Sequence, residues 1–104
     1  MPNVTTAISI DHAALAAFCQ RHHIQKLSLF GSVLRPDFGT DSDVDVLVEF
    51  EPGHAPGFLA LHDIEAECSK LLGGHSVDLV TLRSLNRHLR DRILASAEVE
   101  YADG

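Results

Sequence analysis

Three aspartates stand where polar segments of the sequence meet apolar runs that are typical of strands. Asp43 and Asp45 open the run DVDVLVEF at residues 43–50, and Asp78 lies in the run SVDLVT at residues 76–81. Residues i and i+2 of a strand point to the same side, with Cα atoms about 6.5 Å apart. Asp43 and Asp45 can therefore converge on one point above a sheet, and Asp78 could join them from another strand.

Such a group of carboxylates suggests a cation site. Carboxylates held close together repel one another, and water, a proton or a cation must relieve that repulsion. Oxygen ligands without a nearby Cys or His favour a hard cation, and magnesium held by one or two carboxylates keeps positions open for water and substrate phosphates. Asp78 could bind a second ion or accept the proton of an attacking hydroxyl.

A Gly-Ser pair between the first strand-like run and the aspartates suggests a phosphate cradle. Gly31 would let the backbone approach a ligand closely, and a helix that begins at Ser32 would offer free amides and a hydroxyl to an anion. Arg35 could add a forked contact to a phosphate. Pro36 disfavours a helical conformation at Arg35, so we expect the helix to be short. Cradle and carboxylates together predict a nucleoside triphosphate held through its phosphates.

Hydrophobic periodicity predicts the elements that must position these residues. Helices are expected at residues 11–22, 58–72 and 83–97, and strands at residues 26–31, 43–50 and 76–81. Ser9 or Asp11 could cap the first helix, and the tail could add a short edge strand. This order predicts an α/β (α+β) fold, a small mixed sheet with helices packed mainly on one face. The aspartates would lie on the other face.

Length and composition limit the classes of protein to which the chain can belong. Its 104 residues are enough for a single domain, residues 1–104, with one core. The net charge of −7 argues weakly against direct binding of nucleic acid, which normally needs a basic patch. No run approaches the roughly 20 apolar residues of a membrane span, and the N-terminus lacks the basic region of a signal peptide. We therefore expect a cytoplasmic protein without membrane or nucleic-acid contacts.

The cysteines and histidines show no spacing that is typical of metal ligands. Cys19 and Cys68 fall on the apolar stripes of two predicted helices, which favours buried reduced thiols over a disulfide. The seven histidines include no HxxxH or HExxH pair. Structural or surface roles are therefore expected for the histidines.

The motif GSVLR at residues 31–35, followed by SDVDVLV at residues 42–48, resembles a known family signature. It is similar to the minimal nucleotidyltransferase (MNT) domains of the DNA polymerase beta-like nucleotidyltransferase superfamily, whose signature is GSxxR, a short spacer and SDxDxxV. The resemblance extends over nearly the whole chain and implies the nucleotidyltransferase fold. Leu34 and Pro36 depart from the alanine and glycine that are common at these positions.

The resemblance also implies a role for each residue of the motif. The catalytic residues and metal ligands would be Asp43, Asp45 and Asp78, which would hold two Mg²⁺ ions. The nucleotide-binding residues would be Gly31, Ser32, Arg35 and Ser42. An acceptor hydroxyl would attack the α-phosphorus of ATP and pyrophosphate would leave, with the metal ions stabilising both oxygens.

Single-domain MNT proteins resemble the antitoxins of HEPN/MNT toxin–antitoxin pairs, which implies a protein partner. By this resemblance the chain would be a protein adenylyltransferase that transfers AMP to a tyrosine of a HEPN ribonuclease toxin. One alternative is a binding module that silences its partner by contact and has a vestigial nucleotide site. Another is a small-molecule nucleotidyltransferase of the antibiotic-modifying kind, although such enzymes usually carry an additional helical domain. The three acids favour the enzyme over the contact inhibitor.

Overall fold

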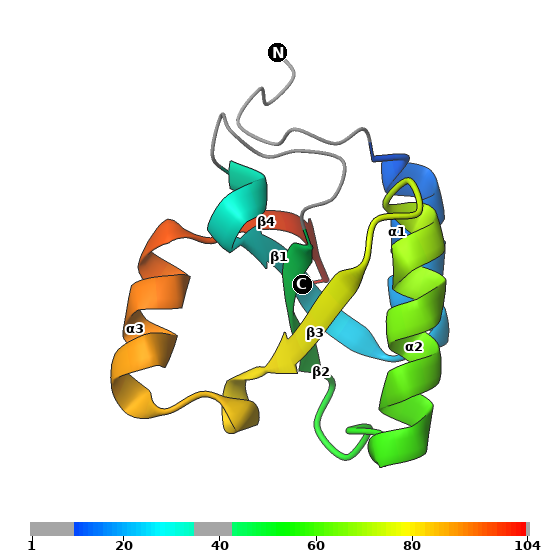
Figure 1. The fold of residues 1–104 in the computed structure, drawn as a ribbon. Helices are drawn as coiled ribbons and strands as arrows, with labels where there is room; N and C mark the ends of the chain where they lie inside the picture. The colour runs from blue at the N-terminus through cyan, green and yellow to red at the C-terminus, as the bar shows by residue number, and fades with distance from the viewer. Residues whose placement is uncertain (1–9, 35–42, 104) are drawn as a thin grey trace.

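The computed structural model describes residues 10–34 and 43–103, which form a four-stranded sheet flanked by helices (Figure 1). In chain order the regular elements are α1 (His12–Arg21), β1 (Ile24–Phe30), β2 (Val44–Phe50), α2 (Phe58–Leu71), β3 (Val77–Thr81), α3 (Arg87–Ser96) and β4 (Glu98–Ala102). Short 3-10 helices, η1 (Gly31–Leu34) and η2 (Leu82–Ser84), follow β1 and β3. Every helix and strand expected from the sequence is present, and the tail does form an edge strand.

The sheet is mixed, as predicted, with the strand order β3-β2-β1-β4. β1 pairs antiparallel with β2 on one side and with β4 on the other. β2 and β3 run parallel, and α2 forms the crossover that a parallel pair requires. None of the described helices is both long enough and apolar enough to span a membrane.

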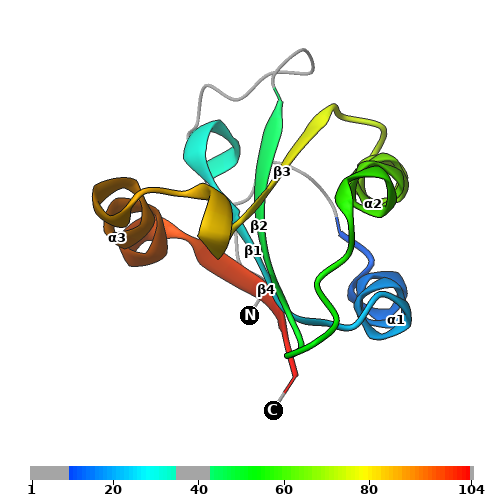
Figure 2. The same ribbon diagram turned by 90° about the horizontal axis from the view of Figure 1, so that it is seen from below.

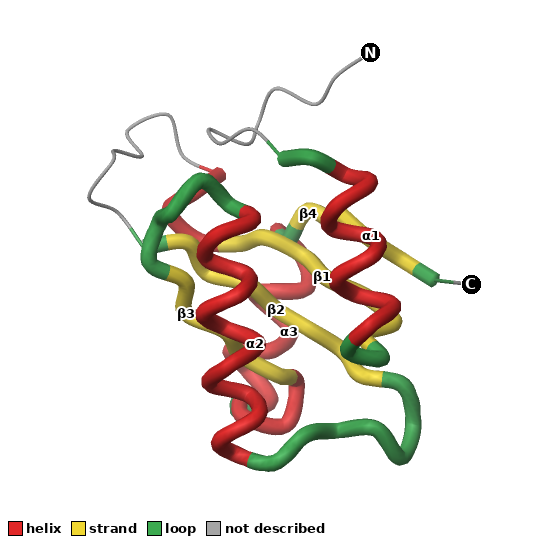
Figure 3. The backbone as a smooth tube through the Cα atoms, turned by 90° about the vertical axis from the view of Figure 1, so that its right-hand side faces the viewer, coloured by secondary structure: helices red, strands yellow, loops and turns green. Residues whose placement is uncertain are grey.

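The hydrophobic core lies between one face of the sheet and the helices α1 and α2, which lie side by side over it (Figure 3). The alternation predicted in β2 is confirmed, because Val44, Val46 and Val48 are all fully buried. Each such side chain contributes about 1.5–3 kcal/mol when it leaves water. The helices contribute Leu15, Phe18, Cys19, Ile64 and Cys68.

Both cysteines are free and buried within this core, as predicted. Burial raises the pKa of the Cys19 thiol to about 12, and the nearby Cys68 adds to the shift. Burial likewise raises the pKa of Cys68 to about 12, with smaller effects from Glu65 and Glu67. The protonated thiols therefore behave as small apolar side chains at neutral pH.

Side-chain caps explain where two of the helices begin. Asp11, one of the two predicted caps, accepts hydrogen bonds from the amides of Ala13 and Ala14 at 3.0 and 3.2 Å. α3 begins at Arg87, four residues later than expected, because Asn86 caps it by accepting from the Leu89 amide at 2.9 Å. Residues 82–84 form η2 instead of the first turn of this helix.

α3 lies on the opposite side of the sheet from α1 and α2 (Figure 2). The prediction that the helices pack mainly on one face of the sheet therefore holds for α1 and α2. The other face of the sheet is partly covered by α3. Helical spacing in residues 83–97 predicts that Leu89 and Ile93 both face inward; α3 does bury Ile93, whereas Leu89 is 42% exposed. The expectation for Leu89 was wrong because the buried residue of α3, Ile93, lies in the second half of the helix.

Candidate active site

Asp45 and Asp78 are register partners on neighbouring parallel strands. Asp45 is the second residue of β2 and Asp78 is the second residue of β3. Paired strands lie about 4.8 Å apart, and partners opposite each other project from the same face of a sheet. The pairing thus brings together two of the predicted acids that are far apart in the sequence.

Asp43 immediately precedes β2 at the same end of the sheet. The amide of Val44, the next residue, donates to the carbonyl of Ser76 at 2.8 Å, so β2 and β3 begin pairing level with each other. Asp43 and Asp78 are exposed, whereas Asp45 is half-buried. The three predicted acids therefore lie where β2 and β3 start, with Asp45 as the most enclosed member. Their carboxylate oxygens are not among the groups of three ligand atoms that lie within 4.8 Å of one another in the described part of the chain.

Gly31 lies directly against the Asp45 carboxylate. Asp45 is paired with Phe30, the last residue of β1, and Gly31 follows that residue with a φ of +76°. A Cβ atom added to Gly31 would lie 2.2 Å from Asp45 Oδ2 and 3.2 Å from its Cγ. The carboxylate thus occupies the space that any other side chain would need, and the left-handed backbone independently favours glycine. Gly31 therefore lies beside one of the predicted acids, while its predicted contact with a phosphate stays a prediction.

The other predicted nucleotide-binding residues are described only in part. Ser32 lies next to Gly31 in the backbone of η1, which is a 3-10 helix of four residues and agrees with the expectation of a short helix. Arg35 and Ser42 lie outside the described residues. Their predicted contacts with a nucleotide remain predictions.

Glu65 of α2 holds the edge strand beside the acids. Its Oε2 accepts a hydrogen bond from the amide of Leu79 at 3.0 Å, one residue after Asp78. β3 is an outer strand of the sheet, so this amide faces away from β2 and would otherwise need a partner in solvent. Sequence periodicity placed Glu65 on a helix but offered no signal for this contact.

The donors at this end of the sheet suit a hard divalent cation. They are carboxylate oxygens, and two of them come from register-paired residues, Asp45 and Asp78. Magnesium takes one or two protein carboxylates and completes its shell with water and phosphate oxygens. The chemistry of the donors therefore fits a hard divalent cation such as Mg²⁺.

A cavity of about 480 Å³ lies away from the aspartates, at the opposite end of β2. Among its lining residues are Phe50, Glu51, Pro52 and Leu61. This end of the molecule also holds a cluster that sequence reasoning missed, formed by His23, Glu51 and His54. The ligands come from two separate loops, so no spacing motif marks them. The antiparallel pairing of Ile24 with Phe50 is what brings the loops together.

Comparison with known proteins identifies the family to which the chain is similar. The family model for "Polymerase beta, Nucleotidyltransferase" matches residues 14–102. The chain is 38% identical over 77 residues to MJ0435 of Methanocaldococcus jannaschii, provisionally named a protein adenylyltransferase, covering 74% of this chain and 80% of that protein. It is 37% identical over 82 residues to the protein adenylyltransferase MntA of Thermococcus cleftensis, and the match covers 79% of this chain and 78% of that protein.

Solved structures share the fold. A structure provisionally named a minimal nucleotidyltransferase is 36% identical with a TM-score of 0.68 and covers 83% of this chain and 85% of that chain. A toxin–antitoxin complex with AMP-PNP has a TM-score of 0.71 at 20% identity, and the match covers 89% of this chain and 74% of that chain. A complex of tri-AMPylated Shewanella oneidensis HEPN toxin with an MNT antitoxin has a TM-score of 0.63 at 20% identity. That match covers 88% of this chain and 69% of the other chain.

The family match extends from α1 to β4 and includes the strands that carry Asp45 and Asp78. The geometry agrees with it, because Asp45 contacts the Gly31 backbone and pairs with Asp78. Fold, acidic site and sequence similarity therefore lead to one assignment: the chain belongs to the polymerase beta nucleotidyltransferase family.

Proposed function

We propose that the chain is a metal-dependent protein adenylyltransferase that acts as an antitoxin, transferring AMP from ATP to a tyrosine hydroxyl of a HEPN-type ribonuclease toxin. The observation that carries this proposal is the Asp45 carboxylate, which contacts Gly31 and pairs with Asp78. Relatives named protein adenylyltransferases support the reaction. The solved complex with a tri-AMPylated HEPN toxin supports the class of partner.

The acids supply a site for two Mg²⁺ ions. Asp43 and Asp45 would hold one ion, and Asp78, the register partner of Asp45, would hold the second ion or accept a proton. Bound Mg²⁺ would stabilise charge on the attacking and leaving oxygens. Asp45 and Asp78 lie on neighbouring strands and Asp43 directly precedes β2, so binding of the ions would draw together carboxylates that start from one end of the sheet.

The backbone at Gly31 and Ser32 would hold the triphosphate. Gly31 has no side chain, which leaves room for the Asp45 carboxylate, and its φ of +76° turns the chain away from β1. Arg35 and Ser42 would add side-chain contacts to the phosphates. These contacts would leave the α-phosphorus beside the carboxylates.

The transfer would balance as a single displacement. The tyrosine oxygen forms a bond to the α-phosphorus, the bond from that phosphorus to the bridging oxygen breaks, and pyrophosphate leaves. The hydroxyl proton would pass to a carboxylate, and the exposed Asp78 is the candidate acceptor. An exposed acceptor site suits a tyrosine presented on the surface of another protein.

Intact mass spectrometry of a co-expressed HEPN toxin tests the proposal. The toxin should gain one or more AMP units with the wild-type chain and none with the Asp43→Asn, Asp45→Asn variant. Asp63→Asn is the matched control, because Asp63 is an exposed carboxylate on α2, away from the acids. It should leave the modification unchanged.

Two outcomes would contradict the proposal. A toxin that is silenced and bound but unmodified would make the chain a contact inhibitor. Transfer of AMP to an aminoglycoside, with no modification of the toxin, would make it a small-molecule nucleotidyltransferase. A pull-down of the toxin with each variant separates loss of chemistry from loss of the complex.

A further inference from the structure

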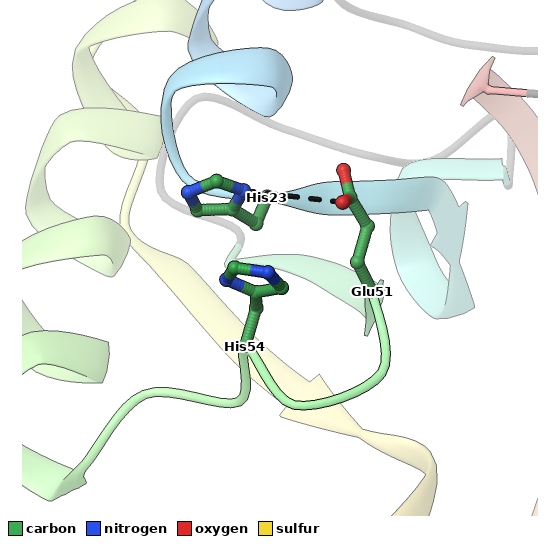
Figure 4. A group of neighbouring side chains, drawn as sticks. All are labelled: His23, Glu51 and His54. Carbon is green, nitrogen blue, oxygen red and sulfur yellow. Dashed lines mark ion pairs between the residues drawn. The ribbon is translucent and has the colours of Figure 1, made fainter.

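The cluster of His23, Glu51 and His54 lies outside the site described above (Figure 4). One donor atom from each side chain lies within 4.8 Å of the others, and among the described residues this is the group of three His, Cys, Asp or Glu side chains that meets that condition. Nδ1 of His23 lies 3.9 Å from Oε1 of Glu51. The rings of His23 and His54 stack, with centroids 3.9 Å apart and planes inclined by 17°.

The backbone holds these three residues together. The Glu51 amide donates to the His23 carbonyl at 2.8 Å, and the His54 amide donates to the Glu51 carbonyl at 3.0 Å. His23 has a φ of +58° and is the one non-glycine residue with positive φ in the described part of the chain. This conformation is unfavourable for a residue with a Cβ atom, yet it directs the His23 ring toward the loop that carries the other two side chains.

Two imidazoles and one carboxylate form a donor set for a first-row transition metal. Zinc accepts His and Glu ligands at about 2.0–2.2 Å and tolerates a water molecule as its fourth ligand. A tetrahedron with such bonds places its donors about 3.4 Å apart. The observed 3.9 Å separation between His23 and Glu51 is close to that spacing. The His23 and His54 rings are stacked with their planes inclined by 17°, so metal binding requires at least one ring to rotate until both in-plane lone pairs point at the ion. His23 and Glu51 side chains are 49% and 39% exposed, which leaves room for that rotation.

We propose that His23, Glu51 and His54 bind one divalent transition-metal ion of the zinc class. The ion would link the turn between α1 and β1 to the loop after β2. Asp45 and Glu51 are six residues apart along β2 and its end, so this site lies about 20 Å from the acidic site. Imidazole nitrogen is a poor ligand for Mg²⁺, so the two sites select different metals.

Calorimetric titration of the metal-free full chain with ZnCl₂, in buffer containing excess Mg²⁺, tests the site. We expect one zinc ion per chain and a rise of several degrees in Tm at saturating zinc, because the ligands converge only in the folded chain. His54→Ala and Glu51→Gln should each weaken zinc binding by about 10-fold or more. His23→Asn should do the same, and asparagine tolerates the left-handed backbone at this position.

Two control variants make the result specific. His88→Ala removes an exposed histidine of α3 that is not part of the cluster and should leave the affinity for zinc unchanged. The Asp43→Asn, Asp45→Asn variant should still bind one zinc ion, which separates this site from the proposed function. Zinc binding that disappears with the aspartates but survives His23→Asn and His54→Ala would overturn the proposal. Absence of both binding heat and a Tm shift in the wild-type chain would also overturn it.

Discussion

Replacement of Gly31 by alanine tests the reasoning about the acidic site most directly. The added Cβ atom would lie 2.2 Å from Asp45 Oδ2, whereas ordinary contacts begin at about 3.4 Å. The carboxylate must therefore move by about 1.2 Å, and a displacement of about 1 Å at a reacting group costs about 100-fold in rate. We expect Gly31→Ala to reduce AMP transfer by about that factor.

The same substitution should also lower stability, for a separate reason. Alanine at a φ of +76° costs about 1–2 kcal/mol, which corresponds to a fall in Tm of about 4–16 °C for a chain of this size. Gly74→Ala is the matched control, because Gly74 has a φ of +84° and no atom within 4 Å of an added Cβ. Gly74→Ala should lose a similar amount of stability and retain full activity.

The assay measures AMP transfer well below the Tm of both variants, by intact mass of the acceptor over time. The Mg²⁺-dependent rise in Tm gives a second measurement that does not depend on the acceptor. Full activity in folded Gly31→Ala would refute the inferred role of the contact with Asp45. An equal loss of activity in Gly74→Ala would show that backbone strain, not displacement of the carboxylate, is responsible.

Four further predictions concern stability and accessibility. Phe18→Ala should lower the free energy of unfolding by about 3–5 kcal/mol in urea titrations, because Phe18 is fully buried between α1 and the sheet. Glu65→Ala should speed hydrogen exchange at the Leu79 amide, whereas Glu65→Gln, which keeps an acceptor, should restore much of the protection. Burial raises the pKa of Cys19 and Cys68 to about 12, so both thiols should resist alkylation at pH 8 until the chain unfolds. Because the folded chain keeps these protons longer than the unfolded chain, stability should fall as pH rises from about 9 toward 12, and Cys→Ala variants should reduce that loss.

The sequence by itself determined the elements and one half of the acidic site. Alternation in β2 identified the buried face through Val44, Val46 and Val48, and the same period of two placed Asp43 with Asp45. Helical spacing located α1 and α2, and Asp11 was recognisable as a cap. These features depend on local geometry, so a short stretch of sequence contains all the information that they require.

Tertiary structure decided how the elements meet. The parallel register of β2 with β3 sets Asp78 beside Asp45, and the end of β1 sets Gly31 against the same carboxylate. Strand partners are chosen by long-range packing of buried faces, which no local period encodes. The face on which α3 lies was beyond prediction for the same reason.

The histidine cluster shows this limit most clearly. His23 and His54 have no motif spacing, and the sequence favoured surface roles for both. They become neighbours because β1 and β2 pair antiparallel, so the residue before one strand lies beside the loop after the other. Sequence determined which side chains could bind a metal, and the pairing of two strands determined which of them meet.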